Sequence, residues 1–447
     1  MARGREGDES ESGTGSVLGL AGIGEGGKGG RSAISRRALL LGVPAVSVTA
    51  AVVLGVVAEQ SENARHRRAL NPPVNPGPAT ARAAGTLAGP SAKPAWSVVL
   101  ERSAHAVAVA SGTVVLVDNY GAVRGFDPKT GAAKWQPSVE FFVNDDSPLT
   151  VVGSTVYGSD DDGHFMAVDA SNGTLSWQTQ FASSGAQIAT VAGTAGPNVF
   201  STGEIDDQSG GNGHGVLWCV DTTTRGTVWN INNVDYSLAV VASEPAGVVV
   251  TADEITYKLT AYSLKDQSVQ WRKEAGNAEA VGIPASPAAC VAVSGKTFYW
   301  AADKLYALDA ASGDVRWTGS APNPGSEFQS VIVVPGQGSG SADLIVATAT
   351  SPSGGTLHAF AADTGALQWV EHGGPKFGSK TALTAGAGVV FAAERDNGSV
   401  FAVDAKTGQT RWTYHDPTIS ADLTWSVAAD DARVYVAYGE HLLAFEP

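Results

Sequence analysis

Three acidic clusters are the first candidates for chemistry in this sequence. Carboxylate and amide oxygens are the ligands that calcium prefers, but no cluster matches the D-x-[DN]-x-[DN]-G spacing of a calcium loop. One cluster stands in GSDDDGHFMAVD, where Asp and Gly are typical of a hairpin turn. We therefore favour turn chemistry over metal binding and assign no metal ligand. The clusters are Asn144-Asp145-Asp146, Asp160-Asp161-Asp162 and Asp206-Asp207.

Other catalytic patterns are not evident in the sequence. The eight His residues, from His66 to His441, are scattered and form no H-x-x-x-H pair. The sequence has no G-x-S-x-G phrase, no Gly-rich phosphate loop between a strand and a helix, and no protein kinase phrase. We therefore assign no catalytic residue.

A repeated phrase organises most of the chain. AVDASNGTLSW (167–177) recurs as ALDAASGDVRW (307–317) and AVDAKTGQTRW (402–412). Seven copies keep the spacing from an apolar pair to a Trp, and successive Trp residues lie 42 to 52 positions apart. This period fits four short strands and their turns, repeated as the blades of a propeller. The repeat tryptophans are Trp135, Trp177, Trp229, Trp271, Trp317, Trp369 and Trp412.

The two ends of the sequence supply an eighth repeat. HLLAFEP has the apolar pair and an acid at Glu446 but no Trp, whereas KPAWSVV has Trp96 but no turn of its own. We expect the strand around Trp96 to complete the blade begun by residues 422–447. The sequence thus predicts an all-β fold over residues 96–447, an eight-bladed β-propeller closed by its N-terminal strand.

Each part of the repeated phrase has a physical interpretation. The apolar residues alternate as strands do, and D-x-x-[TSN]-G forms the hairpin turn between two strands. The Asp accepts hydrogen bonds from backbone N–H groups, and the Gly takes the positive φ that the turn needs. The Trp packs between adjacent sheets, with its indole N–H within reach of a backbone carbonyl. We therefore expect Trp96 and the seven repeat tryptophans to be structural.

These phrases resemble the tryptophan-docking repeats of pyrroloquinoline-quinone (PQQ)-like propellers. The resemblance implies the fold but not one function, because the family includes quinoprotein dehydrogenases, an outer-membrane assembly lipoprotein and sensor regions attached to bacterial kinases. A dehydrogenase of this kind needs PQQ, a calcium ion, an Asp base and a flat aromatic floor. Many of the alcohol dehydrogenases also carry an adjacent Cys-Cys disulfide, and this chain has no such pair.

The two cysteines are predicted to be free. In the repeat register Cys219 lies in the third strand of blade three and Cys290 in the first strand of blade five. Their Cα atoms should therefore be too far apart for a disulfide, and we expect buried thiols.

A ligand site is expected where the first strands converge on the central channel, under the loops between blades. Trp425 lies outside the docking register, and its indole either provides a floor for a flat ligand or packs the channel wall. Lys376 and Lys380 either meet an anionic ligand or stay solvated. The candidate residues in this funnel are Asn144, Asp146, Tyr236, Glu327, Lys376, Lys380 and Trp425.

Three segments precede the propeller. Residues 1–34 are rich in Gly, Ser and Glu and are predicted to be a disordered cytoplasmic tail. Arg36 and Arg37 precede an apolar run over residues 38–58, which resembles a twin-arginine export signal. This run is either a cleaved signal or a membrane anchor. Residues 59–95, rich in Pro and Ala, are predicted to be an extended linker.

These features favour a protein that works outside the cytoplasm. A net charge of −15 argues against a nucleic-acid partner, because phosphate contacts need a basic surface. We expect a secreted or membrane-anchored, non-catalytic propeller that binds a protein or an envelope ligand as a scaffold or sensor, without a cofactor. The alternative is a PQQ- and calcium-dependent quinoprotein oxidoreductase that acts on alcohols or sugars.

Overall fold

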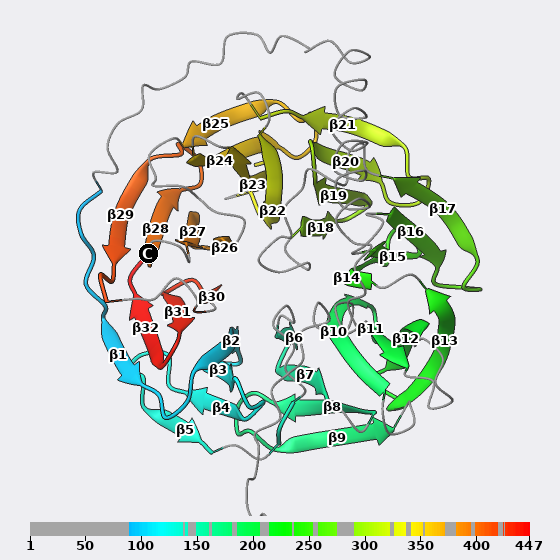
Figure 1. Cartoon of the computed structure of the whole chain (residues 1–447), viewed down its shortest axis with the longest axis horizontal. Helices are drawn as coiled ribbons and strands as arrows, with labels where there is room; N and C mark the ends of the chain where they lie inside the picture. The colour runs from blue at the N-terminus through cyan, green and yellow to red at the C-terminus, as the bar shows by residue number, and fades with distance from the viewer. Residues whose placement is uncertain are drawn as a thin grey trace, which may run out of the picture. The chain divides into compact units, whose positions relative to one another are not determined.

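The computed structural model contains a closed ring of eight four-stranded sheets (Figure 1). All named elements in the described part of the chain are strands. No helix within this part is long and apolar enough to cross a membrane, and the predicted signal or anchor lies outside it. The described residues are 89–136, 139–141, 149–160, 163–180, 186–205, 214–234, 237–253, 258–274, 290–321, 326–336, 341–351, 354–371, 381–394, 398–418, 423 and 425–447.

The first four blades each contain four consecutive antiparallel strands. Blade one contains β2 (Ala104–Ala110), β3 (Thr113–Asp118), β4 (Val123–Phe126) and β5 (Ala133–Trp135). Blade two contains β6 (Thr150–Val152), β7 (Thr155–Ser159), β8 (His164–Asp169) and β9 (Leu175–Gln180). Blade three contains β10 (Ala186–Ala195), β11 (Asn198–Ile205), β12 (His214–Asp221) and β13 (Gly226–Val234). Blade four contains β14 (Ser237–Ser243), β15 (Val248–Asp253), β16 (Lys258–Ser263) and β17 (Val269–Glu274).

Blades five to seven follow the same plan, whereas blade eight takes its fourth strand from the N-terminal part of the propeller. Blade five contains β18 (Val291–Ser294), β19 (Thr297–Ala301), β20 (Leu305–Asp309) and β21 (Val315–Gly319). Blade six contains β22 (Glu327–Val334), β23 (Leu344–Ser351), β24 (Gly354–Ala361) and β25 (Leu367–Glu371). Blade seven contains β26 (Thr381–Gly386), β27 (Val389–Glu394), β28 (Ser399–Asp404) and β29 (Thr410–His415). Blade eight contains β30 (Trp425–Ala429), β31 (Val434–Tyr438), β32 (His441–Phe445) and β1 (Trp96–Val99).

The N-terminal strand closes the ring in the predicted way. β1 pairs antiparallel with β32, so that Trp96 lies opposite Ala444 and Val99 opposite His441. In Figure 1 the blue strand β1 accordingly lies beside the red strand β32. Each first strand contacts the first strands of both neighbouring blades, and blade eight contacts blade one. The eight-bladed, end-to-end closure predicted from the repeats is therefore confirmed.

The contacts of the N-terminal segment begin before Trp96. Ala92 N donates to Thr413 O at 2.7 Å, and Thr413 N donates to Pro90 O at 3.1 Å. Ala95 N then donates to Ala444 O at 2.7 Å. Residues 90–95 thus pass along β29 of blade seven before the chain enters blade eight.

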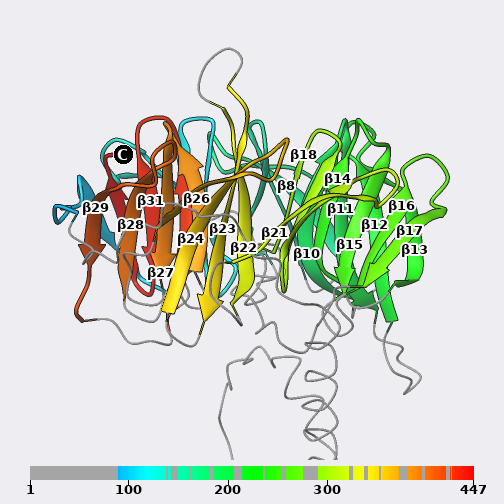
Figure 2. The same cartoon turned by 90° about the horizontal axis from the view of Figure 1, so that it is seen from above.

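The hydrophobic core lies between neighbouring blades. One cluster joins blade five to blade six through residues such as Tyr299, Leu305 and Ile345, and another joins blade seven to blade eight. In Figure 2 the strands of each blade run between the two faces of the ring, so each sheet presents a broad side to its neighbour. Each face of a sheet is buried by a neighbouring blade, because one blade cannot bury its own faces. Contacts between neighbouring blades therefore stabilise the ring.

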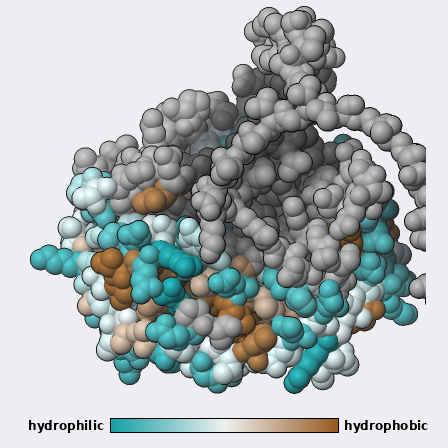
Figure 3. All heavy atoms as spheres, turned by 60° about the horizontal axis from the view of Figure 1, so that its bottom comes forward, coloured by the Kyte–Doolittle hydropathy of each residue, from teal (hydrophilic) through white to brown (hydrophobic). Residues whose placement is uncertain are grey.

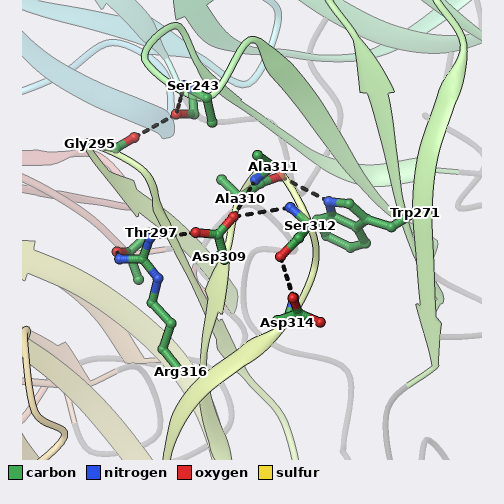
Figure 4. A network of polar contacts seen from close by, with 11 residues as sticks. Ser243, Trp271, Gly295, Thr297, Asp309, Ala310, Ala311, Ser312, Asp314 and Arg316 are labelled. Carbon is green, nitrogen blue, oxygen red and sulfur yellow. Dashed lines mark hydrogen bonds and ion pairs between the residues drawn. The ribbon is translucent and has the colours of Figure 1, made fainter.

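The repeated turn forms as its sequence predicts, and blade five shows it in detail (Figure 4). Asp309 Oδ1 accepts hydrogen bonds from Ala311 N and Ser312 N, both at 3.0 Å. Gly313 takes a φ of 73°. Arg316 Nη2 donates to Asp309 Oδ2 at 2.6 Å, and this bond is the largest of the causes that hold the pKa of Asp309 below its ordinary value.

Tryptophan from one blade docks on the turn of the next blade. Trp271 Nε1 of blade four donates to Ala310 O of blade five at 2.9 Å. A Cβ atom on Gly313 would lie 2.7 Å from Trp271 Cδ2, so only Gly allows the ring to approach this closely. The same indole-to-carbonyl bond joins Trp96 to Pro128, Trp135 to Ala170, Trp317 to Ala362, Trp369 to Ala405 and Trp412 to Glu446.

Two turns keep this geometry without Gly. Arg225 and Gln267 occupy the position of the turn glycine, with φ values of 60° and 62°. Their N–H groups donate to Asp221 O at 2.8 Å and to Ser263 O at 3.0 Å, as the glycine N–H does in the other turns. The hydrogen-bonded turn therefore imposes a left-handed conformation on residues that do not favour it.

Candidate functional site

Of the seven predicted funnel residues, the structure describes Glu327 and Trp425. The other five lie outside the described residues, so the funnel proposed for them stays a prediction. They are Asn144, Asp146, Tyr236, Lys376 and Lys380.

Glu327 lies at an inner strand of the ring. It is the first residue of β22, the innermost strand of blade six, and it pairs with Thr350 of β23. The next residue, Phe328, donates its N–H to Ala302 O of blade five at 2.8 Å. This bond holds the start of β22 against the hairpin between β19 and β20, so Glu327 belongs to the junction of blades five and six.

The neighbouring hairpin contributes a second carboxylate. Asp303 lies at its tip and accepts a hydrogen bond from Tyr306 Oη at 2.8 Å. The Tyr306 ring in turn packs on Trp300, with the ring centroids 5.5 Å apart. Burial, and to a smaller extent repulsion from Asp303, raises the pKa of Glu327 to about 7. The ionised form of Glu327 is therefore costly in the free protein.

A buried amide completes this group of acceptors. Gln329 sits at a register shift between Phe328 and Ser330, is only 2% exposed, and donates from Nε2 to Thr350 Oγ1 at 3.4 Å. Because Thr350 is the strand partner of Glu327, the Gln329 amide lies on the same side of the sheet as Glu327. Gln329 Oε1 is buried and has no hydrogen-bond partner among the described residues. We call Asp303, Glu327, Gln329 and Thr350 the Asp303–Glu327 site.

Trp425 packs in the core between blades seven and eight, and its predicted contact with a ligand stays a prediction. It begins β30, as predicted, but is only 6% exposed and belongs to the core cluster of blades seven and eight. Its ring stacks on Tyr438, with centroids 4.1 Å apart and an angle of 16° between the planes. Of the two interpretations offered by the sequence, packing therefore describes its environment. Tyr438 donates its hydroxyl to Asp416 Oδ2 at 2.9 Å behind this stack.

The two cysteines of the chain both lie in its described part. Cys219 and Cys290 form no disulfide with each other, as predicted; Cys219 is buried and Cys290 is partly exposed. Burial raises the pKa of each thiol to about 12, so both are protonated at neutral pH. No group of three or more His, Cys, Asp or Glu side chains in these residues is arranged to hold a metal ion.

Large hydrophobic side chains are scattered over the described surface. Figure 3 shows small hydrophobic patches separated by hydrophilic residues on the side that it displays. The most exposed are Val99 and Tyr120, at 74% and 65%. The Tyr120 ring is covered in part by Arg102, whose Cζ lies 4.6 Å from the ring centroid. Isolated residues of this kind do not define an interaction surface.

Asp303 and Gln329 were missed by the sequence analysis. Asp303 occurs in a short hairpin, AADKL, where an Asp is common for turn geometry alone. Gln329 interrupts the apolar pattern of EFQSVIVV and is the one signal that the sequence offers: a polar side chain in an inner strand. Their proximity depends on the packing of two blades, which the repeat spacing does not specify.

A family model identifies the family of this chain. The family model described as outer membrane protein assembly factor BamB matches residues 81–273 and 258–447. The chain belongs to this family of PQQ-like repeat propellers. A search of curated proteins found no match.

Several solved structures share the fold at low sequence identity. BamB from Moraxella catarrhalis is 18% identical, covers 79% of this chain and 97% of its own, and superposes with a TM-score of 0.53. The computationally designed Ika8 protein is 14% identical, covers 78% of this chain and 98% of its own, and has a TM-score of 0.56. A quinohemoprotein alcohol dehydrogenase from Pseudomonas putida HK5 is 13% identical over 79% of this chain and 76% of its own, with a TM-score of 0.49.

Proposed function

We propose that this protein is a non-catalytic binding propeller of the cell envelope, outside the cytoplasm, and that its Asp303–Glu327 site receives a positively charged group of a protein partner. One observation carries the proposal. Glu327 lies at an inner strand beside a second carboxylate, in surroundings that raise its pKa to about 7.

The chemistry of the site favours a cationic group. Glu327 and Asp303 supply carboxylates, and the buried Gln329 Oε1 is an acceptor without a donor among the described residues. A Lys or Arg side chain would donate hydrogen bonds to these oxygens and relieve the repulsion between the carboxylates. The excess of acidic residues in the whole chain would attract a basic segment over a longer range.

The family supports a binding role without specifying the partner. The matched family model carries the description of an assembly factor, and it covers the propeller with two overlapping matches. This description supports the binding of other proteins, which is the use we propose for this ring. A sensor that binds a partner at the same site is included in the proposal.

The alternative, a quinoprotein oxidoreductase, would require PQQ and calcium. Trp425, the one described residue predicted as the aromatic floor, is buried between blades and covered by Tyr438. At the Asp303–Glu327 site the Tyr306 hydroxyl donates to Asp303, and the Tyr306 ring packs on Trp300. We propose no catalytic step for the described residues, and the oxidoreductase remains the alternative to be tested.

Photo-crosslinking in living cells tests the binding proposal. Lys304, next to Asp303, is replaced by a benzophenone amino acid, and Val315, exposed on β21 of the same blade, is replaced in a control. We expect a specific crosslinked protein from position 304 and not from 315. Glu327→Gln, which keeps the shape but removes the charge, should lower that yield at least fivefold. An equal yield from both positions, or a yield that Glu327→Gln leaves unchanged, would contradict the proposal.

The same protein serves to test the alternative. The purified full-length chain is titrated with PQQ in a calorimeter, with and without calcium. We expect no heat of binding in either case. Calcium-dependent binding at micromolar affinity would favour the oxidoreductase and justify dye-linked assays on alcohols and sugars.

A further inference from the structure

The outermost strand of each blade has one edge that no further strand of its sheet pairs with. In every sheet the fourth strand pairs only with the third, and Figure 1 shows these strands along the outside of the ring. At β29 residues 90–92 cover part of this edge. The backbone groups of an open edge can pair with another strand, so proteins usually protect such edges with charged side chains or keep them short.

Six of the eight edges are protected in one of these ways. β1 has no charged residue, but it is only four residues long and lies between Lys93 and Glu101. Five outermost strands carry charged side chains: Lys134 on β5, Arg272, Lys273 and Glu274 on β17, Arg316 on β21, Glu371 on β25 and Arg411 on β29.

The outermost strands of blades two and three lack this protection. β9 (LSWQTQ) and β13 (GTVWNINNV) belong to neighbouring blades, are six and nine residues long, and contain no charged residue. Depletion of charged residues is typical of the core of a protein–protein interface. The exposed residues of the two strands, which we call the blade two–three rim, are Leu175, Ser176, Gln178, Gln180, Thr227, Val228, Asn230, Asn232 and Asn233.

A bulge in the repeat shows the same difference at a single position. In blades one to seven the residue before the repeat Trp is left out of the pairing between the third and fourth strands. Blade three has Val228 there, and this side chain is 53% exposed. In the other six blades the residue is polar: Lys134, Ser176, Gln270, Arg316, Gln368 or Arg411. An exposed apolar residue at this position indicates a surface that a partner covers.

The two faces of β13 differ in what they contact. Trp229 and Ile231 pack against the core cluster that blades three and four share, and the Trp229 ring centroid lies 5.8 Å from that of Phe200. Asn230 and Asn232 lie on the opposite face, because side chains alternate along a strand. Asn230 Nδ2 donates to Asn232 Oδ1 at 3.0 Å. Core packing thus fixes the strand, and its other face presents a row of amides.

We propose that the blade two–three rim is a contact between two copies of this protein, in which β13 pairs antiparallel with β13 of the second copy about a two-fold axis. In such a contact the same surface meets itself. An amide both donates and accepts hydrogen bonds, so a row of Asn side chains is complementary to its own copy. An axis at Ile231 would place Asn230 of one copy opposite Asn232 of the other.

The charge of the chain favours this surface for self-association. Two copies that each carry a net charge of −15 repel one another. They can approach most closely where neither presents a charged side chain, and the outer strands of blades two and three are such a surface. A row of carboxylates or of guanidinium groups would instead meet like charges across the axis.

The dimer is expected to be weak and to strengthen with salt. The rim supplies nine exposed residues per copy, whereas stable interfaces use about 20–30 residues on each side. Salt screens the repulsion between the two acidic copies. A contact held by ion pairs would respond to salt in the opposite direction.

This contact is separate from the Asp303–Glu327 site. β13 is an outermost strand of blade three, whereas Glu327 begins the innermost strand of blade six. The proposal therefore does not depend on the function proposed for that site.

Sedimentation velocity of the purified full-length protein tests the proposal with a matched pair of variants. Val228→Lys and Gln270→Lys each place a lysine at the bulge before the repeat Trp, in blades three and four. The fold accepts a cation at this position, because blade one has Lys134 there. Any association through the apolar residues 38–58 is common to all three proteins, so the difference between the variants reports the rim.

We expect wild type and Gln270→Lys to dimerise at concentrations up to about 0.2 mM. Val228→Lys should dimerise about tenfold more weakly or worse, since each dimer would bury two lysines without partners. Raising the salt from about 0.05 M to 0.5 M should strengthen the wild-type dimer.

The proposal would be overturned by a wild-type protein that stays monomeric, by equal dimerisation of the two variants, or by a dimer that salt dissociates. The melting temperatures of both variants are measured in parallel. If Val228→Lys melts lower than Gln270→Lys, Asn232→Lys replaces it, because this exposed side chain lies in the same row of amides. Unchanged dimerisation of Asn232→Lys would then count against the contact.

Discussion

At the residue scale, glycine in the docking turns is required for two separate reasons. Gly408 has a φ of 68°, and an added Cβ would lie 2.7 Å from Cδ2 of the buried Trp369. Gly112 has a φ of 64°, but nothing lies within 4 Å of its added Cβ. A comparison of Gly408 with Gly112 therefore separates the cost of a positive φ from the cost of the steric clash with the indole.

We expect Gly408→Ala to lower the free energy of unfolding by about 2–4 kcal/mol, since it combines left-handed strain with overpacking. Gly112→Ala should lower it by about 1 kcal/mol, because only the strain applies. Urea unfolding followed by Trp fluorescence measures both. If both variants lost the same free energy of unfolding, close packing of the Trp369 indole would not require the absence of a Cβ atom at residue 408.

The opposite change is expected to stabilise a turn that lacks glycine. Gln267 holds a φ of 62° in the turn of blade four. Gln267→Gly should raise the free energy of unfolding by about 0.5–1 kcal/mol, because it removes left-handed strain at a smaller cost in chain entropy. Gln270→Gly, in the regular strand β17, is the control and should destabilise. A loss of stability in Gln267→Gly would contradict this account of the turn.

Glu327 makes stability depend on pH in a predictable direction. Its pKa in the folded protein, about 7, lies above the ordinary value of 4.5. Between these values the folded state holds a proton that the unfolded state releases, so the free energy of unfolding falls as pH rises from 4.5 to 7. The difference between the two pKa values corresponds to about 3 kcal/mol, and solvent screening of the partly exposed Glu327 side chain reduces the effect to on the order of 2 kcal/mol.

Glu327→Gln should remove that part of the pH dependence. The difference in unfolding free energy between the variant and wild type is measured by urea unfolding from pH 4.5 to 8. We expect this difference to shift in favour of the variant between pH 4.5 and pH 7 and to become constant above pH 7. A difference that is constant over the range would show that Glu327 titrates as an ordinary exposed carboxyl.

At the scale of elements, the strand β1 carries the closure of the ring. β32 pairs with β31 on one side and with β1 on the other. Trp96 Nε1 of β1 donates a hydrogen bond to Pro128 O of blade one at 3.0 Å. Arg433 Nη1 donates to the same carbonyl at 3.1 Å, so the junction of blades eight and one depends on that contact. Without β1, both the edge of blade eight and the indole dock would be lost.

Deleting residues 93–100 should therefore lower the melting temperature sharply. We expect a decrease of about 10 °C or more, which is what a loss of several kcal/mol in the free energy of unfolding produces in a domain of this size. Val99→Thr, at a side chain that is 74% exposed, is the control and should leave it unchanged. Differential scanning calorimetry makes the comparison. A deletion mutant that melts like wild type would contradict the closure by β1.

The elements themselves could be predicted from the sequence to a large extent. Alternating apolar residues and D-x-x-x-G turns are local signals, so the strands next to each Trp follow from the repeats. Closure by Trp96 followed from the Trp missing after Ala444. The passage of residues 90–95 along β29 was not predicted, because a parallel contact between distant segments leaves no periodic signal.

At the scale of the whole molecule, the candidate site was harder to predict than the fold. Glu327 was singled out because it lies in a loop between blades near the expected channel, but its partner Asp303 belongs to the preceding blade. Trp425 was singled out for the same reason, yet Tyr438 covers its ring. Such outcomes depend on how two blades pack side by side, which the sequence of either blade alone does not determine.

The central claim is that this ring works by binding a cationic group at the Asp303–Glu327 site. The most direct test is the affinity of the purified full-length protein for the partner crosslinked from position 304, measured at pH 5.5 and pH 8 for wild type and Glu327→Gln. Other charged groups next to the site, Asp303 and Lys304, are present in both proteins, so the variant isolates Glu327.

A cation binds the ionised form of Glu327, which predominates at pH 8 and is scarce at pH 5.5 when the pKa is about 7. Wild type should therefore bind roughly tenfold or more tightly at the higher pH, whereas Glu327→Gln should bind weakly and show no such change. Equal affinities of the two proteins, or a wild-type affinity that does not rise with pH, would contradict the claim.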